Sequence, residues 1–225
     1  MFRARINVIN KYNKKIQQMG LRVYMRQYAN QEENRQFLNL VGKLKEHYLG
    51  KRELCLFVGG YNIGRAQPDA LLVRKNAIIC VEFKNYGGHI QASSTGKFYK
   101  MRTDGSREGE IKSGNQESVK EQVSKQRELL ANFLNRHFGY NRRDTSKISG
   151  LVVFNGGIAQ LENRLSVSDR YWLNICDNDG FIQEAVRTIQ GRELYCSDEK
   201  IRGLVEYLNL EYLNLQNGGE MIYDG

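Results

Sequence analysis

Two acids and a lysine around a predicted β-hairpin are the residues of this chain best suited to chemistry. Asp69 directly precedes one apolar run, and Glu82 and Lys84 lie at the end of the next, on either side of Phe83. Side chains two residues apart in a strand share a face, so Glu82 and Lys84 should point the same way. Carboxylates beside an ammonium group can hold a cation and stabilise a charged transition state.

The hairpin register predicts that the two acids face each other. If residues 75 and 76 form a two-residue turn, Asp69 lies directly opposite Glu82. Their Cβ atoms would then be about 4.5–5.5 Å apart, and like charges at that separation repel. A divalent cation offsets this repulsion well, since Mg²⁺ prefers oxygen ligands at about 2.0–2.1 Å.

This geometry predicts a metal-dependent phosphodiester hydrolase. Mg²⁺ held by Asp69, Glu82 and the backbone carbonyl of Phe83 would polarise the scissile bond, and Lys84 would orient or deprotonate the attacking water. The alternative is a surface salt-bridge cluster in which Lys84 only neutralises two acids. The preceding Pro68, the apolar strand and the basic surroundings favour the metal site.

The stretch PDALLVRKNAIICVEFKNYGGHI resembles the nuclease-related (NERD) domain, a branch of the PD-(D/E)xK nuclease superfamily. In that family an aspartate opens one strand, a hydrophobic strand ends in E-x-K, and a Lys-Asn-(Tyr)-x-Gly segment follows. Asp69, Glu82, Lys84, Asn85 and Gly88 occupy these places. Three flanking segments resemble the family's leading helix, its glutamine-bearing helix and the following strand, namely QEENRQFLNLVGKL, EQVSKQRELLANFL and ISGLVVFNGG.

The resemblance covers about residues 30–190. It implies an α/β protein with a restriction-endonuclease-like core, in which helices flank a mixed central β-sheet. It also implies a Mg²⁺-dependent deoxyribonuclease, with Mn²⁺ able to substitute, acting in DNA repair, recombination or defence.

Three further residues gain possible roles from this resemblance. Glu33 matches a glutamate that assists the metal site in relatives, although it could instead cap its helix, and Glu32 is a rival for the role. Gln122 and Gln126 lie one turn apart on one helix face. The family places a glutamine and then a tyrosine or glutamine there, so we expect Gln122 in catalysis and Gln126 on nucleic acid. A solvated helix face is the alternative.

Charge points to a polyanionic partner. The formal net charge is +9, with 28 basic and 13 acidic residues in residues 1–147 against 6 and 12 in residues 148–225. Such a surface suits a phosphate backbone, and we expect DNA rather than RNA. Lys97, Lys100 and Arg102, interleaved with aromatics, and Arg65 in a glycine-punctuated loop are the expected contacts. A solvated lysine-rich surface is the alternative.

Hydrophobic spacing and the resemblance together divide the chain into three regions: a basic helical arm at 1–29, the nuclease core that the resemblance implies at 30–190, and a C-terminal helix at 191–225 packed on the core. Residues 21–28 are ambiguous, and 103–115 are expected to form a surface loop. The expected helices are 2–28, Asn30 to Gly50, Gln116–Phe138, Phe181–Gln190 and Ser197–Leu215, and the expected strands are Leu54–Val58, Ala70–Arg74, Ala77–Phe83, Ile90–Ala92, Phe98–Met101, Ile148–Phe154 and Tyr171–Ile175.

The remaining features predict a cytoplasmic protein with no membrane association. No apolar run reaches the roughly 18 residues of a membrane span, no secretion signal is apparent, and the four cysteines are widely spaced. The arm could bind a second copy or a partner protein. A non-catalytic nucleic-acid-binding module of the same fold, or an adaptor for an acidic protein, is the alternative function.

Overall fold

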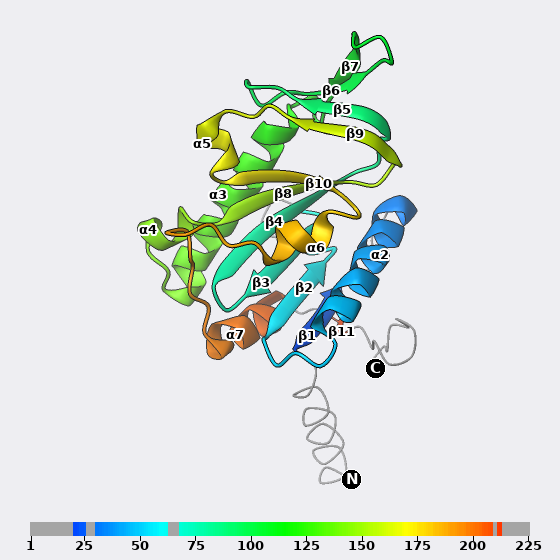
Figure 1. Ribbon diagram of the computed structural model, residues 1–225. Helices are drawn as coiled ribbons and strands as arrows, with labels where there is room; N and C mark the ends of the chain where they lie inside the picture. The colour runs from blue at the N-terminus through cyan, green and yellow to red at the C-terminus, as the bar shows by residue number, and fades with distance from the viewer. Residues whose placement is uncertain (1–19, 26–29, 63–67, 209–210, 213–225) are drawn as a thin grey trace.

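A seven-stranded mixed sheet forms the centre of the molecule (Figure 1). The computed structural model describes residues 20–25, 30–62, 68–208 and 211–212. The strand order is β10 (Leu173–Asp177), β8 (Ser149–Phe154), β4 (Ala77–Lys84), β3 (Ala70–Arg74), β2 (Cys55–Gly59), β1 (Leu21–Met25) and β11 (Glu211–Tyr212). β10, β8 and β4 are parallel, whereas β3 is antiparallel to both its neighbours.

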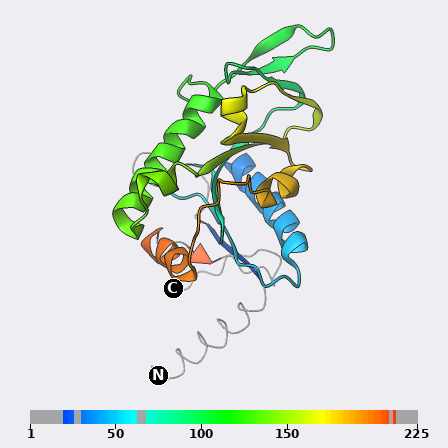
Figure 2. The ribbon, with the colours of Figure 1, turned by 60° about the vertical axis from the view of Figure 1, so that its left-hand side comes forward.

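Helices cover both faces of this sheet (Figure 2). α2 (Gln31–Tyr48) and α6 (Phe181–Val186) lie on one face, where Phe37 stacks on Phe57 at 4.6 Å between ring centroids. α3 (Val119–Phe138) and α7 (Asp198–Leu208) lie on the other. Because both faces are covered, the central strands are apolar on both sides. The predicted α/β class with a helix-flanked mixed sheet is confirmed.

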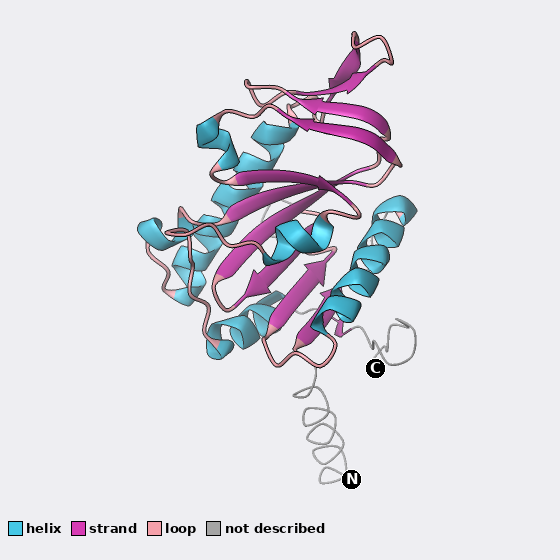
Figure 3. Cartoon of the chain, viewed as in Figure 1, coloured by secondary structure: helices cyan, strands magenta, loops and turns pink. Residues whose placement is uncertain are grey.

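A second sheet of four strands extends the fold beyond β4 and β8 (Figure 3). Its order is β7 (Arg107–Ile111), β6 (Phe98–Met101), β5 (Gly88–Ala92) and β9 (Ile158–Asn163). Ile90 and Phe98 pack against Val119 and Val123 at the start of α3. Two single helical turns, α4 (Arg142–Thr145) and α5 (Val167–Arg170), complete the described elements.

Several predicted elements form as expected. Asn30 is the N-cap of α2, and its side chain accepts from the Glu32 amide at 2.9 Å. The β3–β4 turn is the predicted one, since Arg74 pairs with Ala77. α3 begins three residues later than predicted, because Ser118 and Glu121 form a capping box there.

Four expectations about elements need correction. The helix expected at Phe181–Gln190 ends at Val186. Residues 107–111, expected within a surface loop, form strand β7. β7 is an exposed edge strand that pairs with β6 through its backbone, and it therefore shows no apolar alternation. The last helix ends at Leu208 within the described chain, and residues 211–212 pair with β1. Residues 21–25, predicted as ambiguous, form a strand of the main sheet, so this part of the expected arm is not helical. Residues 1–19 lie outside the described residues.

The four cysteines are free and buried. Among the described helices, none has the length and apolar character needed to cross a membrane.

Backbone contacts join the loops that follow β4 and β8. The Gly156 amide donates to the Tyr86 carbonyl at 3.1 Å, and the Gly88 amide donates to the Gly157 carbonyl at 2.9 Å. This close approach requires glycine: a Cβ on Gly87 would lie 1.8 Å from the Gly156 carbonyl oxygen. The two loops therefore form one rigid rim at this end of the sheet.

We expect Gly87→Ala to lower the free energy of unfolding by about 1–3 kcal/mol, because the methyl group forces the two loops apart. Urea denaturation would measure the change. Gly42→Ala is the matched control, since Gly42 lies within α2 with nothing within 4 Å of its ideal Cβ position, and it should stabilise by about 0.5–1 kcal/mol. Equal stability of Gly87→Ala and the wild type would contradict the rigid rim.

Candidate active site

Glu82 and Lys84 form a buried ion pair at the end of β4. Their relative exposures are 2% and 8%, and Lys84 Nζ lies 2.7 Å from Glu82 Oε1. The predicted shared face of these two side chains is confirmed. Burying two charges is costly unless further hydrogen bonds satisfy the remaining polar atoms. Those hydrogen bonds come from α3.

Two glutamines one turn apart on α3 complete the pair. Gln126 Nε2 donates to Glu82 Oε2 at 2.8 Å, and Lys84 Nζ donates to Gln122 Oε1 at 3.0 Å. Gln126 is only 5% exposed, so this side of α3 is not the solvated face of the alternative interpretation. The structure thus places Gln126, which we expected on nucleic acid, inside the acid–lysine cluster.

Asp69 adds a second carboxylate from the adjoining strand. The β3–β4 ladder ends at the Ala70–Val81 pair, one step short of the predicted pairing of Asp69 with Glu82. Instead, Asp69 Oδ2 accepts a hydrogen bond from the Phe83 amide at 2.6 Å. Burial raises the pKa of Asp69 well above its usual range, and the negative charge of Glu82 raises it further. The two acids are therefore close enough to repel each other.

Glu33, at the start of α2, adds to this concentration of negative charge. Its charge also raises the pKa of Asp69, although less than that of Glu82 does. Its carboxylate accepts from the Asn30 side chain at 3.2 Å, so it both ties the helix start and approaches the acids. Glu32 instead holds Arg35 at 2.9 Å. Of the two rivals, Glu33 is the one whose charge reaches Asp69.

Gln36 is a supporting residue that the sequence interpretation missed. It lies one turn after Glu33, is 2% exposed, and donates through Nε2 to the Val153 carbonyl at 3.0 Å. This bond fixes the start of α2 against β8. The available signal was a glutamine next to Phe37 on the apolar stripe of the helix.

The cluster suits a hard divalent cation in its charge and in its donor atoms. Among the described residues, Asp69, Glu82 and Glu33 supply three carboxylates beside the ammonium group of Lys84, and the pKa of Asp69 is raised first by burial and then by the charge of Glu82. Within the described chain, no three acidic, histidine or cysteine side chains are arranged to hold a metal by themselves. An ion here would therefore rely on Asp69, Glu82 and the Phe83 carbonyl, together with water, as Mg²⁺ commonly does.

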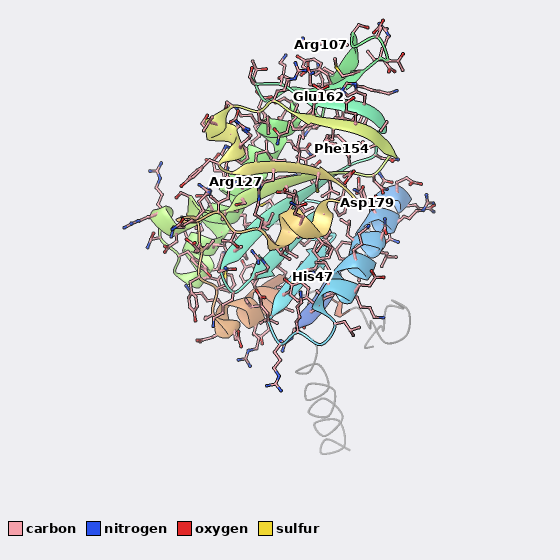
Figure 4. All side chains as sticks on the ribbon, in the orientation of Figure 1. His47, Arg107, Arg127, Phe154, Glu162 and Asp179 are labelled. Atoms are coloured by element: carbon pink, nitrogen blue, oxygen red, sulfur yellow. The ribbon has the colours of Figure 1, made fainter. Side chains whose placement is uncertain are left out.

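Three of the predicted nucleic-acid contacts, Lys97, Lys100 and Arg102, lie instead at the hairpin of β6 and β7, where Figure 4 labels Arg107. Lys97 pairs with Glu110 at 3.4 Å, and Lys100 pairs with Glu108 at 2.9 Å. Arg102 Nη1 lies 3.5 Å from Ser106 Oγ at the turn. Arg65 lies outside the described residues. Much of the hairpin's positive charge is thus already neutralised within the hairpin.

A helix-flanked mixed sheet whose rim carries two acids and a lysine defines a nuclease-like class of protein. Comparison with protein-family models matches residues 29–155 to NERD, the nuclease-related domain. This match spans more than half of the chain, which belongs to the nuclease-related domain family. The match ends with β8, before the expected limit of residue 190. Neither the curated proteins nor the solved structures gave a match.

We expect Asp69→Asn to stabilise the metal-free protein at neutral pH, because it removes a partly buried charge that Glu82 and Glu33 repel. The raised pKa means that the folded chain binds this proton more tightly than the unfolded chain does. The ionised carboxylate therefore opposes folding, and the gain from Asp69→Asn should shrink as pH falls towards about 4, the usual pKa of an aspartate in the unfolded chain.

Urea denaturation in EDTA at pH 7.5 and pH 5 would measure this difference. Asp104→Asn is the control, because hydrogen bonds from Ser106 lower the pKa of Asp104 on an exposed turn. An Asp69→Asn variant less stable than the wild type at pH 7.5 would show that the Phe83 contact outweighs the repulsion.

Proposed function

We propose that this protein is a metal-dependent nuclease that hydrolyses phosphodiester bonds of DNA. The observation that carries the proposal is the Glu82–Lys84 pair, held by Gln122 and Gln126 and accompanied by the partly buried carboxyl group of Asp69, whose pKa burial raises. Groups with perturbed pKa values that gather at one end of a rigid sheet are typical of catalytic sites. Membership of the nuclease-related domain family supports the same reaction class.

Lys84 is the residue proposed to act on the water and the phosphate. An ammonium group has three donor hydrogens, and Glu82 and Gln122 accept two of them. The third is available to an attacking water or a phosphate oxygen. Its positive charge would stabilise the negative charge that develops on the phosphorane. Gln126 has a positioning role, since it fixes the orientation of the Glu82 carboxylate.

Asp69, Glu82 and the Phe83 carbonyl are the proposed ligands of Mg²⁺, for which Mn²⁺ would substitute. When bound, such an ion supplies Lewis-acid stabilisation of the phosphodiester and lowers the pKa of its water. Glu33 would add negative charge from α2. The Phe83 amide holds Asp69 in place for this role.

DNA is the proposed substrate on grounds of charge and exposed aromatic surface. The basic excess of residues 1–147 suits a phosphate backbone. Tyr86 is 39% exposed only two residues after Lys84, and an aromatic ring there could stack on an unpaired base. We place this activity in DNA repair, recombination or defence.

Cleavage of plasmid and of single-stranded DNA with Mg²⁺ or Mn²⁺ would test the proposal. We expect Glu82→Gln and Lys84→Gln each to lower the rate by roughly 100-fold or more, because each removes a group that acts in the transition state. Lys43→Gln and Asp179→Asn are the matched controls. These two residues form an ion pair outside the cluster, with 3.0 Å between Lys43 Nζ and Asp179 Oδ1. Both controls should cleave at the wild-type rate.

Thermal unfolding with and without Mn²⁺ separates catalysis from folding. Wild-type protein should melt at a higher temperature with the ion. At an ion concentration 100 times the dissociation constant, binding stabilises the folded state by about 2.7 kcal/mol, and Glu82→Gln should lose this stabilisation. Metal-independent cleavage, or cleavage that survives both substitutions, would refute the assigned roles. DNA binding without cleavage would instead favour a non-catalytic module.

The two adjacent glutamates of α2 give a separate test of the site. Glu33→Gln should lower the cleavage rate by about tenfold, because the charge of Glu33 reaches Asp69. Glu32→Gln should have little effect, since Glu32 pairs with the exposed Arg35. Steady-state kinetics of both variants on one DNA substrate would measure the difference. The reverse order would assign the supporting role to Glu32.

A further inference from the structure

A pocket of about 450 Å³ opens beside β10, away from the acid–lysine cluster. Its walls come from the end of β9, α5, β10, α6 and the segment after α6, and α5 and β10 lie side by side in Figure 1. The polar side chains include Arg170, Asn174 and Arg187, and the apolar ones include Tyr171 and Ile175. This volume and this mixed lining are usual for small-molecule sites.

A smaller hollow of about 20 Å³ adjoins the pocket and shares Asn174 and Arg187 with it. It adds two further basic side chains, Lys147 and Arg192, and the hydroxyl-bearing Thr188. The space suits about one water molecule. Together the two hollows bring four basic side chains to one place.

These basic side chains have little carboxylate to balance them. Glu184 is the one acid that lines either hollow, and it pairs with Arg187 at 2.9 Å. Across the described part of the chain, Lys147, Arg170 and Arg192 form no ion pair with an acid: Lys147 donates to the Glu193 carbonyl at 2.8 Å and Arg192 to the Ser146 carbonyl at 2.9 Å. The site therefore has an excess of positive charge.

This cluster of basic side chains is unusual because most of it comes from the acidic part of the sequence, residues 148–225. Residues 148–225 contain six basic and twelve acidic residues, yet three of the six basic ones line the two hollows. Guanidinium groups bind phosphate oxygens well, often through two hydrogen bonds. Arg170 has no acid partner among the described residues, and Arg187 would share its guanidinium group between Glu184 and the phosphate. The charge points to an anionic ligand with a phosphate group.

The apolar wall indicates what the phosphate is attached to. Tyr171 is 50% exposed at the pocket, and the Arg192 guanidinium lies 4.7 Å from its ring centroid. Ile175 lines the same space from β10. A flat aromatic surface next to cations suits a ring system that carries a phosphate.

We propose that this pocket binds a nucleoside monophosphate, with the phosphate at Arg170 and Arg187 and the base against Tyr171. It is a separate site from the acid–lysine cluster. Ile79, which lines the smaller hollow, points to the α2 and α6 face of β4, whereas Glu82 and Lys84 contact α3 on the opposite face. The proposal is therefore independent of the nuclease function.

Isothermal titration calorimetry of the full chain in EDTA tests the proposal, with deoxyadenosine monophosphate as the probe. We expect saturable binding to one site, at least about tenfold tighter than binding of deoxyadenosine or inorganic phosphate alone. Arg170→Gln and Arg187→Gln should each weaken binding by about tenfold or more. Arg143→Gln, an exposed arginine on α4, should bind as the wild type does.

Glu82→Gln separates the two sites, since it should bind the nucleotide with wild-type affinity. No binding by the wild type at millimolar concentration, or unchanged binding by Arg170→Gln and Arg187→Gln, would overturn the proposal. Inorganic phosphate that binds as tightly as deoxyadenosine monophosphate would overturn the assignment of the base to Tyr171. Loss of binding in Glu82→Gln would place the ligand at the acid–lysine cluster instead.

Discussion

The buried ion pair between Glu82 and Lys84 constrains much of the surrounding structure. Strand geometry turns both side chains to the α3 face, where they are buried and need protein partners for their polar atoms. α3 must therefore be positioned along its axis, and rotated about it, so that Gln122 and Gln126 reach Lys84 and Glu82. The capping box at Ser118 sets where the helix begins, and the packing of Val123 and its apolar neighbours sets its rotation. A slip of one residue in either element would leave buried charges without partners.

The same region concentrates interactions that oppose folding. Asp69 brings a second carboxylate towards Glu82, and Glu33 approaches from α2, whereas Lys84 is the ammonium group that the described residues place beside them. Such repulsion persists only where the surrounding structure holds the groups in place. Here the joined loops after β4 and β8, and the bond from Gln36 to β8, provide that support. Carboxylates that repel one another lower the stability of the metal-free protein, and a cation bound at this position would offset that repulsion.

Sequence reasoning located the acids and the lysine because their spacing depends on short-range rules. A two-residue turn fixed the hairpin register, and strand parity placed Glu82 beside Lys84. The partners of Gln122 and Gln126 could not be predicted from the sequence, since helical periodicity defines a shared face but not what that face contacts. β7 was not predicted because it is a polar edge strand, held by its backbone pairing to β6. Asp69 lies one step beyond the ladder because its side chain, and not its backbone, engages the Phe83 amide.

Net charge alone is a poor guide to where an anion binds in this fold. The basic part of the sequence includes the β6–β7 hairpin, yet its glutamates pair with Lys97 and Lys100 and remove much of the local potential. In the acidic part, Arg192 contacts a carbonyl group and an aromatic ring, and neither Arg192 nor Arg170 pairs with an acid among the described residues. Carbonyls and rings leave a formal charge in place, whereas a carboxylate cancels it. Anion affinity follows the charge that remains after internal pairing, and this quantity depends on the folded arrangement of the side chains.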